Sequence, residues 1–496
     1  MINKYLLSSL ACISFYTTQA QPSSKLPNII FILADDIGYA DFSCYGAKTI
    51  ATPHIDELAA NGIRFTNAYA PASTSSPSRY ALLTGEYAFR KRVGILPADA
   101  PLTIDPQSNN LPLQLKSSGY TTGIVGKWHL GLGNRNETVD FNKKITAGMR
   151  SVGFDYSYIF PATNDRVPTI FLENDQVVNG DPNDPIKVSY RKKIGNEPTG
   201  KENPDLLTLK YYQGHDGTII NGISRIGWMS GGHKARWNDQ EMGEVLSNQA
   251  VSFIRENKQK PFFLYYATHN AHEPRVPNPK FAGQSKAGIY GDMIEEFDEY
   301  VGRIIETLKK EGIFENTLLI ISSDNAPMIK EGYHDGAEEN IGSHRPCADL
   351  RGAKYSLYEG GTKVPFIVSY PSLVKKPFVQ TQRFSYIDML ATVASITQAK
   401  PYRNSLNDSK DASELFRSPS APVYRDYIIT QNNGGDIAIR KNDWKYIPSK
   451  NELFHLKKDP NEKINLSQTE KGKSIINDLS SLIKNIANKD IQDDIL

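Results

Sequence analysis

The sequence NIIFILADDIG, residues 28–38, indicates the class of fold. Its first seven residues form an unbroken apolar run rich in β-branched side chains, which is typical of a strand buried on both faces of a parallel sheet. The run ends in Asp35 and Asp36, two adjacent carboxylates that repel each other unless a cation lies between them. Taken alone, the same pair could also cap a helix that follows the strand. The stretch therefore predicts an α/β fold with polar chemistry at the end of a central strand.

Three further stretches repeat this arrangement of an apolar strand followed by polar side chains. We expect strands at residues 120–125, 261–268 and 317–323. The polar side chains that follow them are, in turn, Lys127 and His129, then His272, then Asp324 and Asn325. In open α/β sheets, ligands bind where loops meet at the carboxyl ends of the strands. The coincidence of four such strands predicts one site at that edge of a large, mostly parallel sheet flanked by helices.

The sequence STSSPSRYALLTG, residues 73–85, predicts a helix with an anion-binding end. Ser76 can cap the helix, Pro77 suits its first position, and Gly85 can end it in a left-handed conformation. Ser75 would then lie just outside the helix N-terminus, where free N–H groups and the helix dipole stabilise an anion, with Arg79 one turn further on. A capped surface helix without function is the alternative interpretation of this stretch.

The order Ser-x-Pro-Ser-Arg-x-x-x-Leu-Thr-Gly within this stretch resembles the signature of the type I sulfatases. In that family the first residue of the signature, Cys or Ser, is oxidised to Cα-formylglycine, the catalytic nucleophile, and here that residue is Ser75. The usual final Arg of the signature is replaced by Glu86. The resemblance extends from the first strand to the small C-terminal domain, and it implies an alkaline-phosphatase-like sulfatase fold with a catalytic domain over residues 25–400.

The resemblance also implies the other members of the site. Carboxylate and amide oxygens suit Ca²⁺ or Mg²⁺ and offer no thiolate or imidazole for zinc. The residues expected to bind one ion, Ca²⁺ in preference to Mg²⁺, are Asp35, Asp36, Asp324 and Asn325. The residues expected to hold the nucleophile, the sulfate or its leaving oxygen are Arg79, Lys127, His129, His272 and Lys354. Ala326 stands where the family usually has Gly, which leaves the expected ligands intact.

The family mechanism explains why an unmodified serine is not expected to be sufficient. One hydroxyl of the hydrated aldehyde attacks sulfur, His272 with Lys354 protonates the departing alcohol, and His129 takes the proton of the second hydroxyl so that sulfate leaves. A plain serine has no second hydroxyl and would remain sulfated. A formylglycine-generating maturase is therefore implied, and Ser at position 75 resembles the bacterial subset matured by a radical SAM enzyme.

Residues 154–240 lack clear periodicity and are rich in Asn, Asp, Gly, Pro and aromatic residues. Irregular segments on a rigid scaffold often carry recognition residues, so we interpret this range as an insertion that binds a sulfated carbohydrate. Functionless surface loops look similar. The candidate substrate-binding residues are Arg166, His215, His233, Arg236 and Trp237.

Residues 401–496 predict a smaller C-terminal α+β domain. The composition shifts towards Lys, Asn, Asp and Ser near residues 400–420, and short alternating runs after them indicate an antiparallel sheet. Ile475, Leu479, Leu482 and Ile486 follow helical spacing, so we expect a terminal amphipathic helix that packs on this sheet rather than on a membrane.

The N-terminus and the overall composition suggest an exported protein. Lys4, a short apolar run and Thr18-Gln19-Ala20 predict a signal peptide over residues 1–20, too short to span a membrane, and a periplasmic location. Cys12 after Leu10 and Ala11 resembles a lipoprotein cleavage site, but Ser9 fits that pattern poorly, so an outer-surface lipoprotein is the less favoured alternative. The remaining two cysteines cannot form a disulfide framework, and a net charge of +2 argues against nucleic-acid binding.

Together these features predict an exported sulfatase that hydrolyses sulfate esters on carbohydrates such as mucin O-glycans, glycosaminoglycans or other sulfated polysaccharides. A phosphomonoester or phosphonate hydrolase of the same superfold would share the metal and the anion pocket. A non-catalytic glycan-binding protein with unmodified Ser75 is the alternative from another class.

Overall fold

The computed structural model describes residues 26–402 and 408–488. The predicted signal peptide and Cys12 lie outside the described residues. Of the cysteines within them, Cys44 and Cys347 are both free, as the sequence predicts. No helix in the described ranges has the length and apolar character needed to span a membrane.

Within the described residues, ten strands form one mixed sheet in the order β15-β2-β14-β13-β1-β12-β4-β5-β6-β7. Their bounds in that order are Phe378–Gln380, Ile63–Phe65, Phe366–Ser369, Thr317–Ser323, Asn28–Ala34, Phe262–Ala267, Thr121–Lys127, Tyr156–Phe160, Leu172–Glu173 and Gln176–Val177. The central strands β13, β1, β12, β4 and β5 are parallel, and antiparallel strands flank them. The prediction of a large, mostly parallel sheet is confirmed.

The register of the parallel strands brings their carboxyl ends together. Ala34 at the end of β1 pairs with Ser323 of β13, and Ala267 at the end of β12 pairs with Gly126 of β4. The bounds of β1 and β13 agree with the sequence prediction, whereas β4 runs further than predicted and includes Lys127 as its last residue. Lys127 is therefore fixed by the sheet and not by a loop.

Helices cover both faces of this sheet. The helices of the described residues are α1 (Pro53–Asn61), α2 (Ser75–Thr84), α3 (Leu111–Ser117), α4 (Met242–Asn257), α5 (Gly288–Lys310), α6 (Ala337–Asn340), α7 (Glu359–Thr362), α8 (Met389–Thr397) and α9 (Glu470–Ala487). Because successive strand residues point to opposite faces, Phe31 and Leu33 of β1 pack with α2, α3 and α8, while Ile30 and Ile32 pack with α1, α4 and α5.

The start of α2 differs from the sequence prediction. The helix begins at Ser75, with Thr74 as the N-cap, and not after a cap at Ser76. Ser75 is therefore the first helical residue, and its backbone position is set by the helix. The predicted end is confirmed, because Gly85 has φ +68° and donates its N–H to the carbonyl of Ala81.

The range 154–240 is less irregular than predicted. It begins with β5, which pairs in parallel with β4 and extends the main sheet through β6 and β7. Further on, two small antiparallel pairs form: β8 (Lys187–Ser189) with β11 (Trp228–Ser230), and β9 (Ile219–Ile220) with β10 (Ile223–Ser224). The strand that contains the alternating tyrosines Tyr156 and Tyr158 was hidden by the polar composition of the residues after it.

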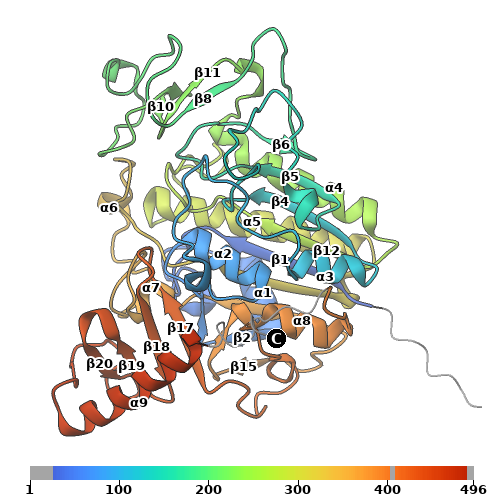
Figure 1. The fold of residues 1–496 in the computed structure, drawn as a ribbon. Helices are drawn as coiled ribbons and strands as arrows, with labels where there is room; N and C mark the ends of the chain where they lie inside the picture. The colour runs from blue at the N-terminus through green and yellow to red at the C-terminus, as the bar shows by residue number, and fades with distance from the viewer. Residues whose placement is uncertain (1–25, 403–407, 489–496) are drawn as a thin grey trace, which may run out of the picture.

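The C-terminal part forms the predicted antiparallel sheet and helix. Within residues 408–488, four strands pair in the order β17 (Tyr427–Gln431), β18 (Ile437–Lys441), β19 (Trp444–Ile447) and β20 (Glu452–His455). Leu479 and Ile486 of α9 pack against Ile439 of β18, so the predicted packing of the terminal helix is confirmed. Figure 1 places this unit beside the main sheet, far from β8, β10 and β11. A remaining small pair joins β3 (Ala68–Tyr69) to β16 (Phe384–Ser385). The boundary at residue 400 stays a prediction.

Candidate active site

Three aspartates meet at the carboxyl ends of β1 and β13. Asp35 and Asp36 follow β1, Asp324 follows β13, and one carboxylate oxygen of each lies within 4.8 Å of the others. All three are essentially inaccessible to solvent. Asp36 adopts φ +58°, which turns the chain sharply and lets the carboxylates of Asp35 and Asp36 lie close together. We call Asp35, Asp36 and Asp324 the aspartate triad.

Ser75 lies directly beside this triad. Its Oγ lies 3.4 Å from Asp35 Oδ1 and 3.3 Å from Asn325 Oδ1. Lys127 Nζ donates to the same Oγ at 3.2 Å and to the two carboxylate oxygens of Asp35 at 2.8 and 2.6 Å. The side chains of Lys127 and Asp35 are both fully buried. The end of β1, the end of β4 and the start of α2 thus place a hydroxyl, an ammonium and a carboxylate in mutual contact.

Arg79 pairs with the third aspartate of the triad. Its Nη2 and Nε donate to Asp324 Oδ2 at 2.7 and 3.0 Å, and both side chains are fully buried. Since Arg79 lies one helical turn beyond Ser75, this ion pair fixes the N-terminus of α2 against the end of β13. The guanidinium therefore positions Ser75 as well as neutralising Asp324.

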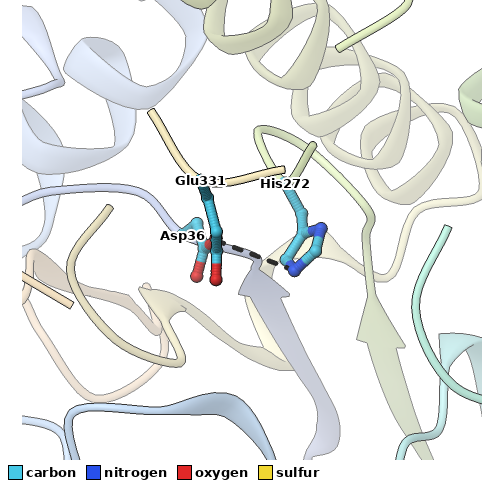
Figure 2. A group of neighbouring side chains, drawn as sticks. All are labelled: Asp36, His272 and Glu331. Carbon is cyan, nitrogen blue, oxygen red and sulfur yellow. Dashed lines mark ion pairs between the residues drawn. The ribbon is translucent and has the colours of Figure 1, made fainter. Parts of the chain in front are cut away.

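Lys354 pairs with Asp36 on the other side of the triad. Its Nζ donates to Asp36 Oδ2 at 2.8 Å and to Glu331 Oε2 at 2.8 Å. His272 lies next to this ion pair, with Nε2 3.9 Å from Asp36 Oδ2. Figure 2 shows Asp36, His272 and Glu331 turned towards one another from three separate loops. Each aspartate of the triad consequently has at least one basic partner.

The pKa values of the triad indicate strong electrostatic strain around Asp35. Burial raises the pKa of Asp35, and the neighbouring Asp324 and Asp36 raise it further against the effect of Lys127. Burial also raises the pKa of Asp324, but Arg79 and Lys127 outweigh it and lower the pKa overall. Burial lowers the pKa of the Lys127 ammonium. A divalent cation would remove this strain, and the carboxylate and amide oxygens gathered here are the ligands that Ca²⁺ and Mg²⁺ prefer. The donor set fits such an ion.

Two histidines near the triad are held as neutral imidazoles. His272 Nδ1 donates to the carbonyl of Glu273 at 2.6 Å, which leaves Nε2 facing Asp36, and burial with the nearby Lys354 lowers the pKa of His272 to about 3. His129 Nε2 lies 3.1 Å from the carbonyl of Leu96, and its Nδ1 has no hydrogen-bond partner among the described residues. Burial and then Lys127 lower the pKa of His129 well below its usual range.

Part of the range 154–240 lies beside the predicted catalytic histidines. Asn164 Nδ2 donates to the carbonyl of His272 at 3.3 Å, which ties this segment to the histidine loop. Arg166 Nη1 lies 3.5 Å from His129 Nε2. His215 Nε2 lies 3.2 Å from Asp165 Oδ2, and although burial opposes it, the contact with Asp165 raises the pKa of His215. We call Asp165, Arg166 and His215 the rim residues.

The structure does not bring the other three substrate-binding candidates to these residues. His233 contacts Asp184 and Glu197, at 2.9 and 3.0 Å. Arg236 also pairs with Glu197. Trp237 is a correction to the sequence prediction: it is 5% exposed and packs on Phe160 and Phe171, so it has no free face for a sugar. An aromatic residue in a polar stretch can belong to the core when aromatic side chains from other segments pack against it.

Two acidic residues that the sequence prediction missed belong to this region. Glu331 contacts Lys354, and the buried carboxylate of Glu273 accepts the backbone N–H groups of Glu331, Gly332 and Tyr333. Glu273 was adjacent to a predicted residue, but Glu331 lies in a loop without periodicity. No signal in one sequence distinguishes it from the glutamates around it.

The structure therefore gathers the sequence-predicted metal and catalytic residues in one buried cluster, while their roles stay predictions. The predicted residues in contact within the cluster are Asp35, Asp36, Ser75, Arg79, Lys127, Asp324, Asn325 and Lys354. His272 borders it through Asp36, and His129 follows two residues after Lys127, the last residue of β4. The cluster thus combines a buried serine hydroxyl with three basic side chains and three carboxylates.

Comparison with known proteins identifies the family. The family model described as Sulfatase matches residues 27–399. An N-acetylgalactosamine-6-O-sulfatase from Bacteroides thetaiotaomicron is 45% identical over 483 residues, which cover 94% of each chain. Steryl-sulfatase from Rattus norvegicus is 31% identical, over 79% of this chain and 70% of its own.

A solved structure from work on the metabolism of multiple glycosaminoglycans by Bacteroides thetaiotaomicron has a TM-score of 0.91 and 45% identity, and the match covers 94% of this chain and 100% of that one. The agreement of sequence and fold extends over both the main sheet and the C-terminal unit. This chain belongs to the sulfatase family and is a sulfuric ester hydrolase.

Proposed function

We propose that this protein hydrolyses sulfate esters on carbohydrates, and that 6-O-sulfated N-acetylgalactosamine is the first substrate to test. The observation that carries the proposal is the placement of Ser75 Oγ, 3.2 Å from Lys127 Nζ and 3.4 Å from Asp35, at the N-terminus of a buried helix. The sugar is suggested by the relative named N-acetylgalactosamine-6-O-sulfatase, which is 45% identical over nearly the whole chain.

The aspartate triad and Asn325 would hold one Ca²⁺ ion, in preference to Mg²⁺. When bound, the ion would supply positive charge against a sulfate oxygen. Asn325 Oδ1 faces Ser75 Oγ at 3.3 Å, so the proposed ligand set and the proposed nucleophile border the same space. Lys127 and Arg79 hold the carboxylates of Asp35 and Asp324 in place for this task.

Ser75 would be oxidised to formylglycine by a maturase, which we infer to be of the radical SAM type. The hydrated aldehyde supplies two hydroxyls, one to attack sulfur and one to release the sulfate afterwards. Lys127 Nζ, which donates to Oγ of residue 75, would favour the deprotonated attacking oxygen. Arg79 would keep the N-terminus of α2, with its free N–H groups, directed at the anion.

Proton transfer would fall to the two histidines. As the new oxygen–sulfur bond forms and the bond from sulfur to the sugar oxygen breaks, His272 with Lys354 would give a proton to the sugar oxygen. His129 would then accept the proton of the second hydroxyl, so that sulfate leaves and the aldehyde returns. Both imidazoles are buried and neutral in the free protein, which suits His129 as the base. His272, as the acid, would gain its proton when the anionic ester binds.

We further propose that the rim residues bind the sugar and that the range 154–240 sets specificity. Of the candidates in that range, Arg166 contacts His129, and His215 contacts Asp165. Export to the periplasm, directed by residues 1–20, is part of the same proposal, because sulfated glycans are met outside the cytoplasm.

The experiment uses full-length protein from its native host, or co-produced with a radical SAM maturase. We expect release of sulfate from N-acetylgalactosamine 6-sulfate, slower release from other sulfated sugars, and little hydrolysis of an aryl phosphate. Ser75→Ala should keep the fold and lose turnover. Mass spectrometry of the peptide that contains residue 75 should find a loss of two hydrogens.

Preferential phosphate turnover would favour the phosphohydrolase alternative. Binding of the sugar without turnover, by protein whose Ser75 is unmodified in the native host, would favour a binding protein. Activity retained by Ser75→Ala would contradict the proposed nucleophile.

A further inference from the structure

Glu331 contacts Lys354 at the edge of the site and has no role in the proposed chemistry. Its carboxylate is within 4.8 Å of Asp36 and His272, a spacing that could suit a second metal ion. Figure 2 shows the three side chains converging. However, Lys354 Nζ already lies 2.8 Å from both Asp36 Oδ2 and Glu331 Oε2, so an ammonium occupies the place of a cation. The cluster is an ion pair with two anionic partners.

The two carboxylates that bind Lys354, those of Asp36 and Glu331, differ in their other contacts. Asp36 belongs to the aspartate triad and also accepts from Asn325 Nδ2 at 2.6 Å. A divalent ion on the triad would compete with Lys354 for Asp36. Glu331 lies outside the triad, so it would keep its full attraction for Lys354 when the ion is bound.

Glu331 is itself held in a fixed place. The carboxylate of Glu273, which is 2% exposed, accepts N–H groups from Glu331 at 3.1 Å and from Tyr333 at 3.0 Å, and also from Gly332. Arg275 pairs with Glu273 at 3.1 Å and completes this buried network. Because Glu273 follows His272 directly, these hydrogen bonds attach the loop that carries Glu331 to the loop that carries His272.

We propose that Glu331 is a positioning residue that keeps the Lys354 ammonium on the substrate side of the metal site. The inference rests on the proposed function, in which Lys354 and His272 meet at the sulfate and its leaving oxygen. Without Glu331, the remaining partner of Lys354 is Asp36, and the ammonium would move towards the metal ligands. Glu331 thus sets the distance between the two groups that act on the leaving oxygen.

The test compares Glu331→Gln with the wild type. Gln has nearly the shape of Glu but no charge, so the ion pair with Lys354 is lost. We expect kcat to fall roughly 10- to 100-fold, because small misplacements of a group that acts on the reacting atoms are costly. In a Lys354→Met background the same change should have little further effect, because Glu331 acts through Lys354. Glu338→Gln, which removes an exposed pair with Lys330, is the matched control.

A second measurement does not depend on turnover. Inorganic sulfate is titrated calorimetrically into the calcium-loaded protein. Removing a negative charge near an anion site should by itself strengthen sulfate binding, whereas misplacing Lys354 should weaken it. We expect Glu331→Gln to weaken it. Tyr355→Phe removes only the hydroxyl that donates a hydrogen bond to Glu331, so it should weaken sulfate binding by a smaller amount. This variant replaces Glu331→Gln if the latter does not fold.

The proposal is overturned if Glu331→Gln binds sulfate as tightly as the wild type or more tightly, or if its effect on kcat multiplies with that of Lys354→Met. A wild type without sulfatase turnover would count against the proposed function alone, since the sulfate titration still decides the role of Glu331.

Discussion

Replacing Lys127 by Met tests the electrostatic basis of the site. Lys127 is fully buried, and its Nζ contacts both oxygens of Asp35, at 2.8 and 2.6 Å. Met has a similar length and no charge, so the cavity stays filled while the ion pair is lost. Asp35 would keep only the more distant guanidinium of Arg79, 3.7 Å from Oδ1.

The expected loss of stability follows from this burial. Removing one partner of a fully buried ion pair costs about 3–5 kcal/mol, because the other charge is left without compensation. Globular proteins gain about 2.1 cal/mol/K of entropy per residue on unfolding, which gives roughly 1 kcal/mol/K for this chain of 496 residues. The melting temperature of the metal-free Lys127→Met protein should therefore fall by about 3–5 °C.

Calcium should reverse this loss. Lys127 and the ion compete for Asp35, so the variant should bind Ca²⁺ more tightly, and Ca²⁺ should raise its melting temperature more than that of the wild type. Thermal unfolding in EGTA and in Ca²⁺ measures both effects. Lys143→Met, at a lysine whose side chain is 80% exposed, is the matched control and should change neither value. Equal melting temperatures of Lys127→Met and wild type in EGTA, or equal calcium shifts, would refute the reasoning.

Two further predictions concern Glu296 and Gly332. Burial raises the pKa of Glu296 from 4.5 to about 7, so folding favours the protonated carboxyl. As the pH rises from about 4.5 to 7, the wild type should therefore lose about 3 kcal/mol of unfolding free energy, whereas Glu296→Gln, which does not titrate, should not. Urea titrations at both pH values measure this, and parallel pH profiles of the two proteins would contradict it. A Cβ at Gly332 would meet His215 Nε2 at 2.4 Å, so Gly332→Ala should push the imidazole away from Asp165 and raise KM for the sulfated sugar. Turnover of a small aryl sulfate should not change, and an unaltered KM for the sugar would exclude His215 as a substrate-binding residue.

Most of the central sheet could be predicted because its signal is local. A strand buried on both faces needs a continuous apolar run, and the runs that form β1 and β13 have the same bounds in the sequence prediction and in the structure. Once these strands are parallel and adjacent, Asp35 and Asp324 must meet, because each follows the last residue of its strand. The metal-ligand candidates Asp35, Asp36, Asp324 and Asn325 owe their positions to that rule.

The features that the sequence did not predict depend on contacts between distant segments. Ser75 begins α2 instead of preceding it, and Thr74 is the N-cap, although Ser76 and Pro77 offered an equally good cap and first position. Trp237 is buried because Phe160 of β5 and Phe171, the residue before β6, pack against it. The composition of a stretch does not show which distant residues will pack against it.

Glu331 illustrates the same limit at the site. Its position depends on Glu273, 58 residues earlier in the chain, whose carboxylate accepts its backbone N–H. Nothing in the local sequence distinguishes it from Glu338 or Glu339 nearby, which are exposed. Only the folded loop separates a glutamate in the site from glutamates on the surface.

The charges of the site are consistent with the proposed binding of a metal ion together with a sulfate ester. With every carboxylate ionised, the aspartate triad and Glu331 carry four negative charges, and the basic side chains paired with them in the described structure carry three positive charges. The neutral histidines add none, so the formal charge is −1, which repels a sulfate ester. A divalent cation changes it to +1 and complements the single negative charge of the ester. Because linkage is reciprocal, an ion that strengthens sulfate binding must itself bind more tightly when sulfate is present. The basic side chains beside the aspartates offset much of the negative charge of the triad, and the proposed ion would supply the remaining attraction for the substrate.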